Sequence, residues 1–179
     1  MGVIGPKMLE LSGSIADGTV VSVLASAAYV RWLREHVAAG QAAAGRTDHH
    51  RVATYALYSV DHDSAKAKAA IRNVTAFYLG AVPRSSLVEV YGIGPELWDM
   101  VTRGGVDAAA TIDREMPAAW LEDLVVAGDP DECVAKINAL IEAGSDSVCL
   151  YPVPTEDVER IIELTAREVL PHVKGGVTA

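Results

Sequence analysis

Apolar positions along the chain fall into two alternating patterns. Continuous apolar runs occupy residues 18–24, 52–60 and 147–151, and each has the length of a strand buried on both faces. Between and after these runs, apolar residues recur every three or four positions, at residues 30–37, 134–141 and 158–169, as in amphipathic helices. Strands of this kind alternating with such helices predict an α/β fold with a parallel, helix-covered sheet. A doubly wound open sheet and a barrel both fit this pattern.

Proline, glycine and capping residues mark the expected helix boundaries. Pro6 opens a first helix at the position where a missing N–H has no consequence. The buried face of this helix is expected to carry Met8, Leu11 and Ile15, and residues 3–5 are read as the stub of one more strand. Asp129 and Glu132 form a capping box around a proline, and Thr155 is expected to cap the last helix.

The segment 80–127 interrupts the regular alternation. It is rich in helix-forming residues but is punctuated by Pro83, Gly92, Gly94-Pro95, Gly104-Gly105 and Pro117. No long polar linker bounds it, so we expect a helical insertion before the last strand rather than a second domain. The chain is therefore predicted to form a single domain over residues 1–174, with a disordered tail at 175–179.

Composition and charge narrow the class of protein. Half of the 179 residues are apolar and the net charge is −9, which disfavours nucleic acids and anionic membrane surfaces as partners. We find no transmembrane run and no signal peptide, and therefore expect a cytoplasmic protein with a small-molecule substrate. Cys133 and Cys149 lack metal-ligand spacing, so we expect two buried reduced thiols and no metal site.

Several short segments resemble the bacterial luciferase-like superfamily, in the order in which that family has them. They are closest to its deazaflavin-dependent branch, which includes methylene-tetrahydromethanopterin reductase. The segments are residues 4–11 (IGPKMLEL), 15–18 (IADG), 29–32 (YVRW), 58–61 (YSVD), 78–80 (YLG), 128–132 (GDPDE) and 150–152 (LYP). Together they extend over most of the chain.

The resemblance implies an eight-stranded (β/α)8 TIM barrel, of which this chain supplies the C-terminal half. By that template the chain holds the end of strand 5 and strands 6–8, and residues 80–127 match the family's insertion. A whole barrel needs roughly 250 residues, and the N-terminal half of the pattern is not found in this sequence. That half carries much of the family's flavin-ring pocket and its proton-transfer residues, so these roles are not transferred to any residue here.

The resemblance also implies a flavin- or deazaflavin-dependent oxidoreductase that carries out hydride transfer or monooxygenation. Coenzyme F420, a deazaflavin, is favoured over flavin mononucleotide (FMN). The alternative is a catalytically inactive, truncated remnant or fragment that acts at most as a binding module and uses no cofactor. The half-barrel would leave apolar strand edges open. We therefore expect a homo-oligomer, or a complex with a complementing N-terminal half-barrel.

The segment Val3-Ile4-Gly5-Pro6 is the principal candidate for cofactor binding. Gly5 permits a close backbone approach, and Pro6 begins a helix whose free N–H groups suit a phosphate. In the family, the matching Gly-Pro loop lies near the phosphate or ribityl part of the cofactor. An ordinary tight turn between a strand and a helix explains the same residues.

Other candidates follow the ends of the expected strands or lie in the insertion. His62, between two carboxylates, is a candidate acid or base, although Asp63 or Ser64 as a helix cap is the favoured interpretation. Asp61, Tyr151 and Arg84 are candidates for lining a substrate site, against simpler packing or surface roles. Three histidines without recognisable partners are expected at the surface: His36, His49 and His50.

Overall fold

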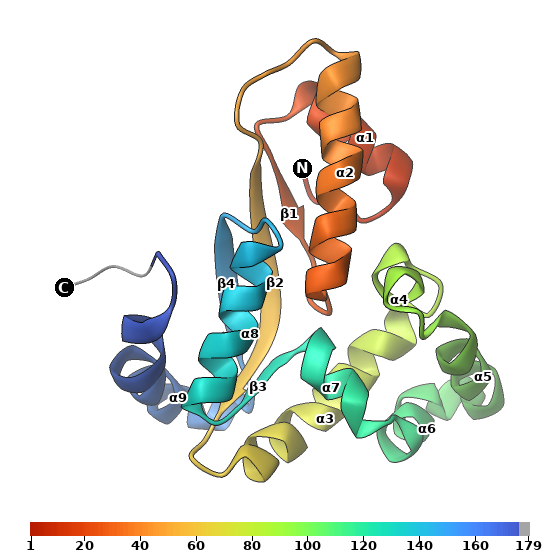
Figure 1. Ribbon diagram of the computed structural model, residues 1–179. Coiled ribbons are helices and arrows are strands. Elements are labelled where there is room, and N and C mark those ends of the chain that lie inside the picture. Colours follow the sequence, from red (N-terminus) through yellow and green to blue (C-terminus); the bar gives the residue numbers. More distant parts are fainter. Residues whose placement is uncertain (176–179) are drawn as a thin grey trace.

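Strand β2 (Arg51–Val60) is the centre of a four-stranded parallel sheet in the computed structural model, which describes residues 1–175 (Figure 1). Strand β4 (Ser147–Pro152) pairs with β2 from Ala53 to Tyr58. Strands β1 (Gly18–Val21) and β3 (Val126–Gly128) pair with the first and last residues of β2. Ala53 pairs with both β1 and β4, and Tyr58 pairs with both β3 and β4. Strands β1 and β3 therefore lie along the same side of β2, and β4 lies along the other side.

The observed strands confirm the parallel sheet that the apolar runs predicted. The first run was expected to reach Leu24, but β1 ends at Val21. Leu24 has a left-handed backbone with φ of 71°, so the chain turns away from the sheet before this residue. The segment before Pro6 joins the sheet through one parallel bridge between Gly2 and Val20. Val20 N–H donates to the Met1 carbonyl at 2.7 Å, close to the expected strand stub.

One face of the sheet is covered by helices α1 (Pro6–Ile15), α2 (Ala27–Ala43), α8 (Pro130–Glu142) and α9 (Val158–Leu164). Their side chains pack on the strand residues that point to this face, such as Val21, Val52 and Val60. The capping box on α8 is present as predicted. Thr155, however, makes no side-chain cap and begins a short 3-10 turn at Thr155–Asp157. After α9 the chain forms a π-helical turn (Thr165–Val169) and a 3-10 turn (Leu170–His172).

The predicted buried face of α1 is wrong. Met8, Leu11 and Ile15 are 44 %, 40 % and 65 % exposed, whereas Leu9, Ser12 and Gly13 are buried. The reason is a close crossing of α1 and α2, in which a Cβ atom on Gly13 would overlap the Val37 carbonyl and one on Gly40 would overlap the Glu10 carbonyl. Two glycines thus decide which face of α1 turns inward, and the helical periodicity of large apolar residues gives no sign of it.

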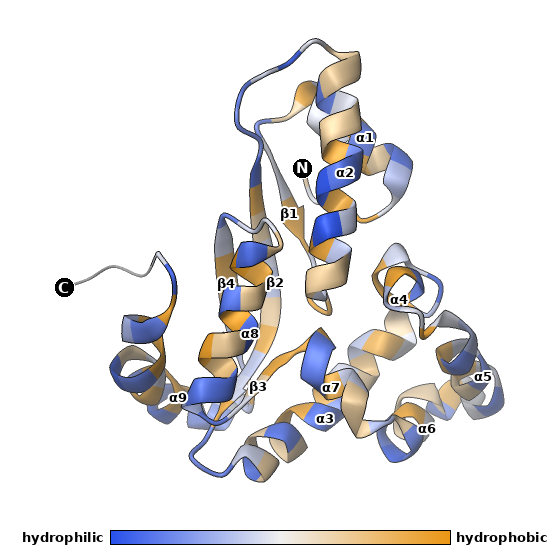
Figure 2. Ribbon diagram, in the orientation of Figure 1, coloured by the Kyte–Doolittle hydropathy of each residue, from blue (hydrophilic) through white to orange (hydrophobic). Residues whose placement is uncertain are grey.

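Residues 64–124 form a helical layer that packs against β3 and the carboxyl-terminal part of β2 (Figure 1). Its helices are α3 (Ser64–Ala81), α4 (Ser86–Tyr91), α5 (Gly94–Gly104), α6 (Ala108–Glu115) and α7 (Ala118–Leu124), with a 3-10 turn at Gly105–Asp107. These helices enclose a second apolar core that includes Leu57 of β2 and Leu24. In Figure 2 the hydrophobic colouring follows the strands and the inner sides of the helices. The helical character of residues 80–127 agrees with the sequence, while their assignment as the family insertion stays a prediction.

The boundary of the domain at residue 174 also stays a prediction. Residues 176–179 of the expected tail lie outside the described residues.

Candidate functional site

A hollow of about 510 Å³ lies on the face of the sheet that helices α1, α2, α8 and α9 do not cover. This volume is in the range of small-molecule sites. The lining comes from the N-terminal segment, from β1 and the loop after it, and from three tyrosines. The residues are Gly2, Val3, Ile4, Val20, Val21, Ser22, Val23, Tyr55, Tyr78 and Tyr151.

Strand register explains why two of these tyrosines face the same hollow. Tyr151 pairs with Leu57, and Leu57 lies two residues after Tyr55, so both tyrosines project from the same face of adjacent parallel strands. Their exposed fractions are 45 % for Tyr55 and 46 % for Tyr151. Val20, on β1, pairs with Ala53 and lies on this face as well. The third tyrosine, Tyr78, comes from α3 and not from the sheet.

The candidate segment Val3–Pro6 forms the rim of this hollow at the start of α1. Val3 and Ile4 line the hollow, and Gly5 is the N-cap residue of α1 with no side-chain cap of its own. Apart from Gly5 and its two neighbours in the chain, no atom lies within 4 Å of the position that a Cβ on Gly5 would occupy. The Tyr29 hydroxyl donates a hydrogen bond of 2.8 Å to the Ile4 carbonyl and so fixes the segment against α2. Burial raises the pKa of Tyr29, which keeps this phenol a neutral donor.

Asp61 and His62 lie at the carboxyl end of β2, outside the lining of this hollow. Asp61 forms ion pairs with Lys66 at 3.0 Å and Arg160 at 3.1 Å. A hydrogen bond from the Asp63 N–H, followed by the contact with Lys66, lowers the pKa of Asp61. The His62 side chain is 67 % exposed and its Nδ1 lies 3.7 Å from Glu168.

Asp63 is the N-cap of α3, where its carboxylate accepts from the backbone N–H groups of Ala65 and Lys66. The sequence therefore identified the cap correctly, and a cap explains Asp63 without any chemistry. His62 instead borders a separate polar depression with Asp129, Asp131 and Glu168. A role for His62 as an acid or base stays a prediction.

Arg84 lies in the helical layer and is not among the residues that line the hollow. Its guanidinium stacks on the Trp98 ring, 3.6 Å from the ring centroid. Among the three substrate-lining candidates, only Tyr151 lines the hollow, where it lies with Val3 and Ile4. Asp61 and Arg84 both lie outside it.

His50 corrects one further expectation, because it is buried and not at the surface. It is 2 % exposed, and its Nε2 lies 2.9 Å from Thr19 Oγ1, which in turn lies 2.8 Å from Ser12 Oγ. Burial lowers the pKa of His50, so the ring is held neutral. The chain of hydroxyls joins α1 and β1 to the start of β2. Thr19 and His50 are 31 residues apart, so no local spacing in the sequence could have revealed this contact.

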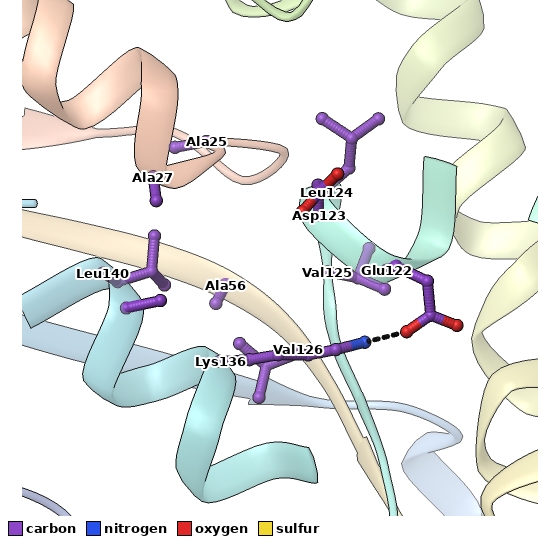
Figure 3. A pocket seen from close by; sticks show the side chains of 11 residues that line it. Ala25, Ala27, Ala56, Glu122, Asp123, Leu124, Val125, Val126, Lys136 and Leu140 are labelled. Atoms are coloured by element: carbon purple, nitrogen blue, oxygen red, sulfur yellow. Dashed lines mark ion pairs between the residues drawn. The ribbon is translucent and has the colours of Figure 1, made fainter. Parts of the chain in front are cut away.

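A second, much smaller pocket lies on the helix-covered side, between α2, α7 and α8 (Figure 3). Lys136 closes it by pairing with Glu122 at 3.0 Å and donating to the Ala127 carbonyl at 2.9 Å. Lys68 of α3 contacts the same Glu122 and also Glu132, each at 2.8 Å. These ion pairs fasten the helical layer to α8, so we assign this pocket a structural role.

Within residues 1–175 no cluster of three or more potential metal ligands is present. Cys133 is buried, and burial raises the pKa of its thiol to about 12. Cys149 is only half-buried, which differs from the expectation for both thiols. No helix in the described part of the chain is long and apolar enough to cross a membrane.

Sequence reasoning missed Tyr55 and Tyr78 as residues of the hollow. Tyr55 lies within an apolar run whose two faces look alike in the sequence, and only the pairing with β4 shows which side stays open. Tyr78 belongs to one of the segments that carried the family resemblance, but its helix had no predicted position relative to the sheet.

The fold and the known proteins that resemble it define the class: an α/β protein of the luciferase-like family. The chain belongs to the luciferase-like monooxygenase family, whose sequence model matches residues 1–147. It is 34 % identical over 180 residues to the 5,10-methylenetetrahydromethanopterin reductase of Methanopyrus kandleri. It is 31 % identical over 175 residues to the enzyme of the same name from Methanolobus tindarius.

Solved structures agree with this assignment. The coenzyme F420-dependent tetrahydromethanopterin reductase of Methanopyrus kandleri matches 96 % of this chain with a TM-score of 0.78 and 32 % identity. An F420-dependent secondary alcohol dehydrogenase matches with a TM-score of 0.67, and at 20 % identity it supports the fold alone. These relatives are enzymes.

The chain spans about half the length of the relatives that it matches. The match with the Methanolobus protein includes 95 % of this chain but only 52 % of that protein. The match with the solved Methanopyrus structure includes 50 % of that chain.

Proposed function

We propose that this chain supplies the C-terminal half of a (β/α)8 barrel in an F420-dependent oxidoreductase of the luciferase-like family. The observation that carries the proposal is the sheet with one face covered by helices and the other left hollow between Val20, Tyr55 and Tyr151. The inner face of a barrel sheet faces other strands of the same barrel. The similarity to relatives named as F420-dependent favours F420 over FMN.

The segment Val3–Pro6 is the part of the chain that fits the polar end of such a cofactor. The start of α1 has no side-chain cap, and the space beside Gly5 is open. Uncapped backbone N–H groups at a helix start bind phosphate well. When bound, coenzyme F420 would supply the hydride chemistry. The residues of this chain would hold the cofactor and exclude water from one side of it.

The hollow is open on the side where a second half-barrel would lie. Completing the barrel would cover the outer edge of β4 and the exposed side chains of the open face. We propose that a complementing N-terminal half-barrel covers this face, with pairing of two copies of the chain as the alternative. The second candidate function is a catalytically inactive remnant or fragment that keeps the fold and binds neither cofactor.

Titration separates these functions. The purified chain, alone and together with the N-terminal half of a full-length relative, is titrated with coenzyme F420 and with FMN while absorbance and fluorescence are recorded. The proposal predicts saturable binding of F420, tighter than that of FMN, at least when the companion half is present. Absence of binding to either cofactor in both settings would favour the remnant.

A Gly5→Ala variant tests the assigned segment. Gly5 has φ of −93° and ψ of 154°, which alanine adopts freely, so the fold should be unchanged. A new methyl group in the open space beside Gly5 should weaken F420 binding by roughly tenfold, about 1.4 kcal/mol. Unchanged affinity with an intact fold would place the polar end of the cofactor elsewhere.

A further inference from the structure

The six tyrosines of the chain divide into two groups of three. In the first group the phenol hydroxyl forms a hydrogen bond within the protein: Tyr29 with the Ile4 carbonyl at 2.8 Å, Tyr58 with Thr165 at 2.8 Å and Tyr91 with Asp123 at 2.9 Å. The other three are Tyr55, Tyr78 and Tyr151. Their hydroxyls have no hydrogen-bond partner within residues 1–175, and all three line the same hollow.

Barrel packing alone does not account for this group. Tyr55 and Tyr151 project from the inner face of the sheet, where the side chains of a completing half-barrel could cover them. Tyr78 comes from α3, a helix that packs on Leu57 of β2 and is not part of the sheet, and it lines the same hollow. Side chains of a barrel interior come from its strands. A third phenol from outside the sheet therefore indicates a ligand-facing wall.

The chemistry of the hollow defines the kind of ligand. Its remaining lining is mostly aliphatic, from the side chains of Val3, Ile4, Val20 and Val23, and the one other hydroxyl is that of Ser22. No lysine, arginine, aspartate or glutamate lines it. Tyrosine rings stack on flat π systems, and their hydroxyls donate to carbonyl or ring-nitrogen acceptors. A charged group finds no charged partner on this surface, and the three phenols favour a flat ring with hydrogen-bond acceptors over a purely aliphatic group.

We propose that Tyr55, Tyr78 and Tyr151 form an aromatic wall that binds a planar heteroaromatic ring bearing carbonyl acceptors. The wall lies beside the Val3–Pro6 segment, because Val3 and Ile4 border the same hollow. One ligand can therefore place a phosphorylated end at the start of α1 and a ring against the tyrosines. This inference rests on the proposed function and adds the residues that recognise the ring.

The test uses the chain together with the companion half-barrel, with F420 and FMN as ring-bearing probes and inorganic phosphate as the ringless control. Tyr78→Leu removes one ring and should raise the dissociation constant of the ring-bearing probe by about two- to tenfold, with phosphate binding unchanged. Tyr78→Phe keeps the ring and should retain most of the affinity. Tyr151→Leu should behave as Tyr78→Leu does. Tyr91→Phe, outside the hollow, is the matched control and should bind as the parent does.

The possible results distinguish a failure of the aromatic wall from a failure of the proposed function. If the parent binds F420 or FMN and both leucine variants bind as tightly, the aromatic wall is wrong and the proposed function stands. If the parent binds neither probe with the companion half present, the proposed function fails and this inference fails with it. Far-ultraviolet circular dichroism checks that the leucine variants fold. Should one leucine variant unfold, the other gives the decision, because Tyr78 and Tyr151 both line the hollow.

Discussion

The close crossing of α1 and α2 predicts that glycine-to-alanine substitution destabilises the protein at Gly40 but not at Gly80. At Gly40 of α2, a Cβ atom would overlap the backbone carbonyl of Glu10, and backbone cannot move aside as the tip of a side chain can. At Gly80 of α3, the nearest atom to a new Cβ is Ile112 Cδ1 at 3.6 Å, an ordinary van der Waals contact. Both glycines lie in the last turns of long helices.

The magnitudes follow from two competing effects. Glycine to alanine in a helix interior gains up to about 1 kcal/mol of helix propensity. Overpacking a close contact costs about 1–3 kcal/mol, and more where backbone must shift. Gly40→Ala should therefore lower the free energy of unfolding by about 1–2 kcal/mol, whereas Gly80→Ala should leave it unchanged or raise it by up to about 1 kcal/mol. In thermal unfolding, each kcal/mol corresponds to about 2–4 °C for a chain of this size.

Urea denaturation of the parent and the two variants, followed by circular dichroism, measures these differences. Equal effects of the two substitutions would refute the reasoning, and so would a stabilising Gly40→Ala. Since α1 begins beside Gly5, Gly40→Ala should also weaken cofactor binding at the start of α1, while Gly80→Ala should not.

Two further predictions concern buried titratable groups. Burial lowers the pKa of the His50 imidazole below the ordinary histidine value of 6.5, so the unfolded chain binds the proton more readily. As pH falls below 6.5, the proton that His50 takes up in the unfolded chain lowers the free energy of unfolding. His50→Gln should flatten this decline on the acid side of pH 6.5, and an unchanged slope would count against a buried neutral ring. Because burial raises the pKa of Cys133 to about 12 while Cys149 is half-buried, iodoacetamide should modify the native protein at Cys149 first, as peptide mass spectrometry can check.

Features encoded within a few neighbouring residues were predictable from the sequence. The apolar runs located the sheet, and the Asp129–Glu132 capping box located the start of α8, because each depends on local spacing. The cap at Asp63 follows the same logic. The start of α1 at Pro6 was also predictable from local sequence, whereas cofactor binding by Val3–Pro6 stays a prediction.

Features set by contacts between distant segments were not predictable. The buried face of α1 depends on Gly13 and Gly40 meeting across two helices, and the large apolar side chains of α1 pointed to the wrong face. His50 is buried because Ser12 and Thr19 come to it from other elements. Tyr55 and Tyr78 reach one hollow only through strand register and the position of α3. Single-sequence periodicity contains no information about such pairings.

Light scattering combined with dye binding tests the central claim, that the open face of this sheet is one side of an incomplete barrel. The account predicts that the isolated chain either associates with itself or binds an apolar-surface dye. Addition of the N-terminal half of a relative should then give a defined complex and abolish the dye signal. A clean monomer that binds no dye, and that is unchanged by the companion half, would contradict the account.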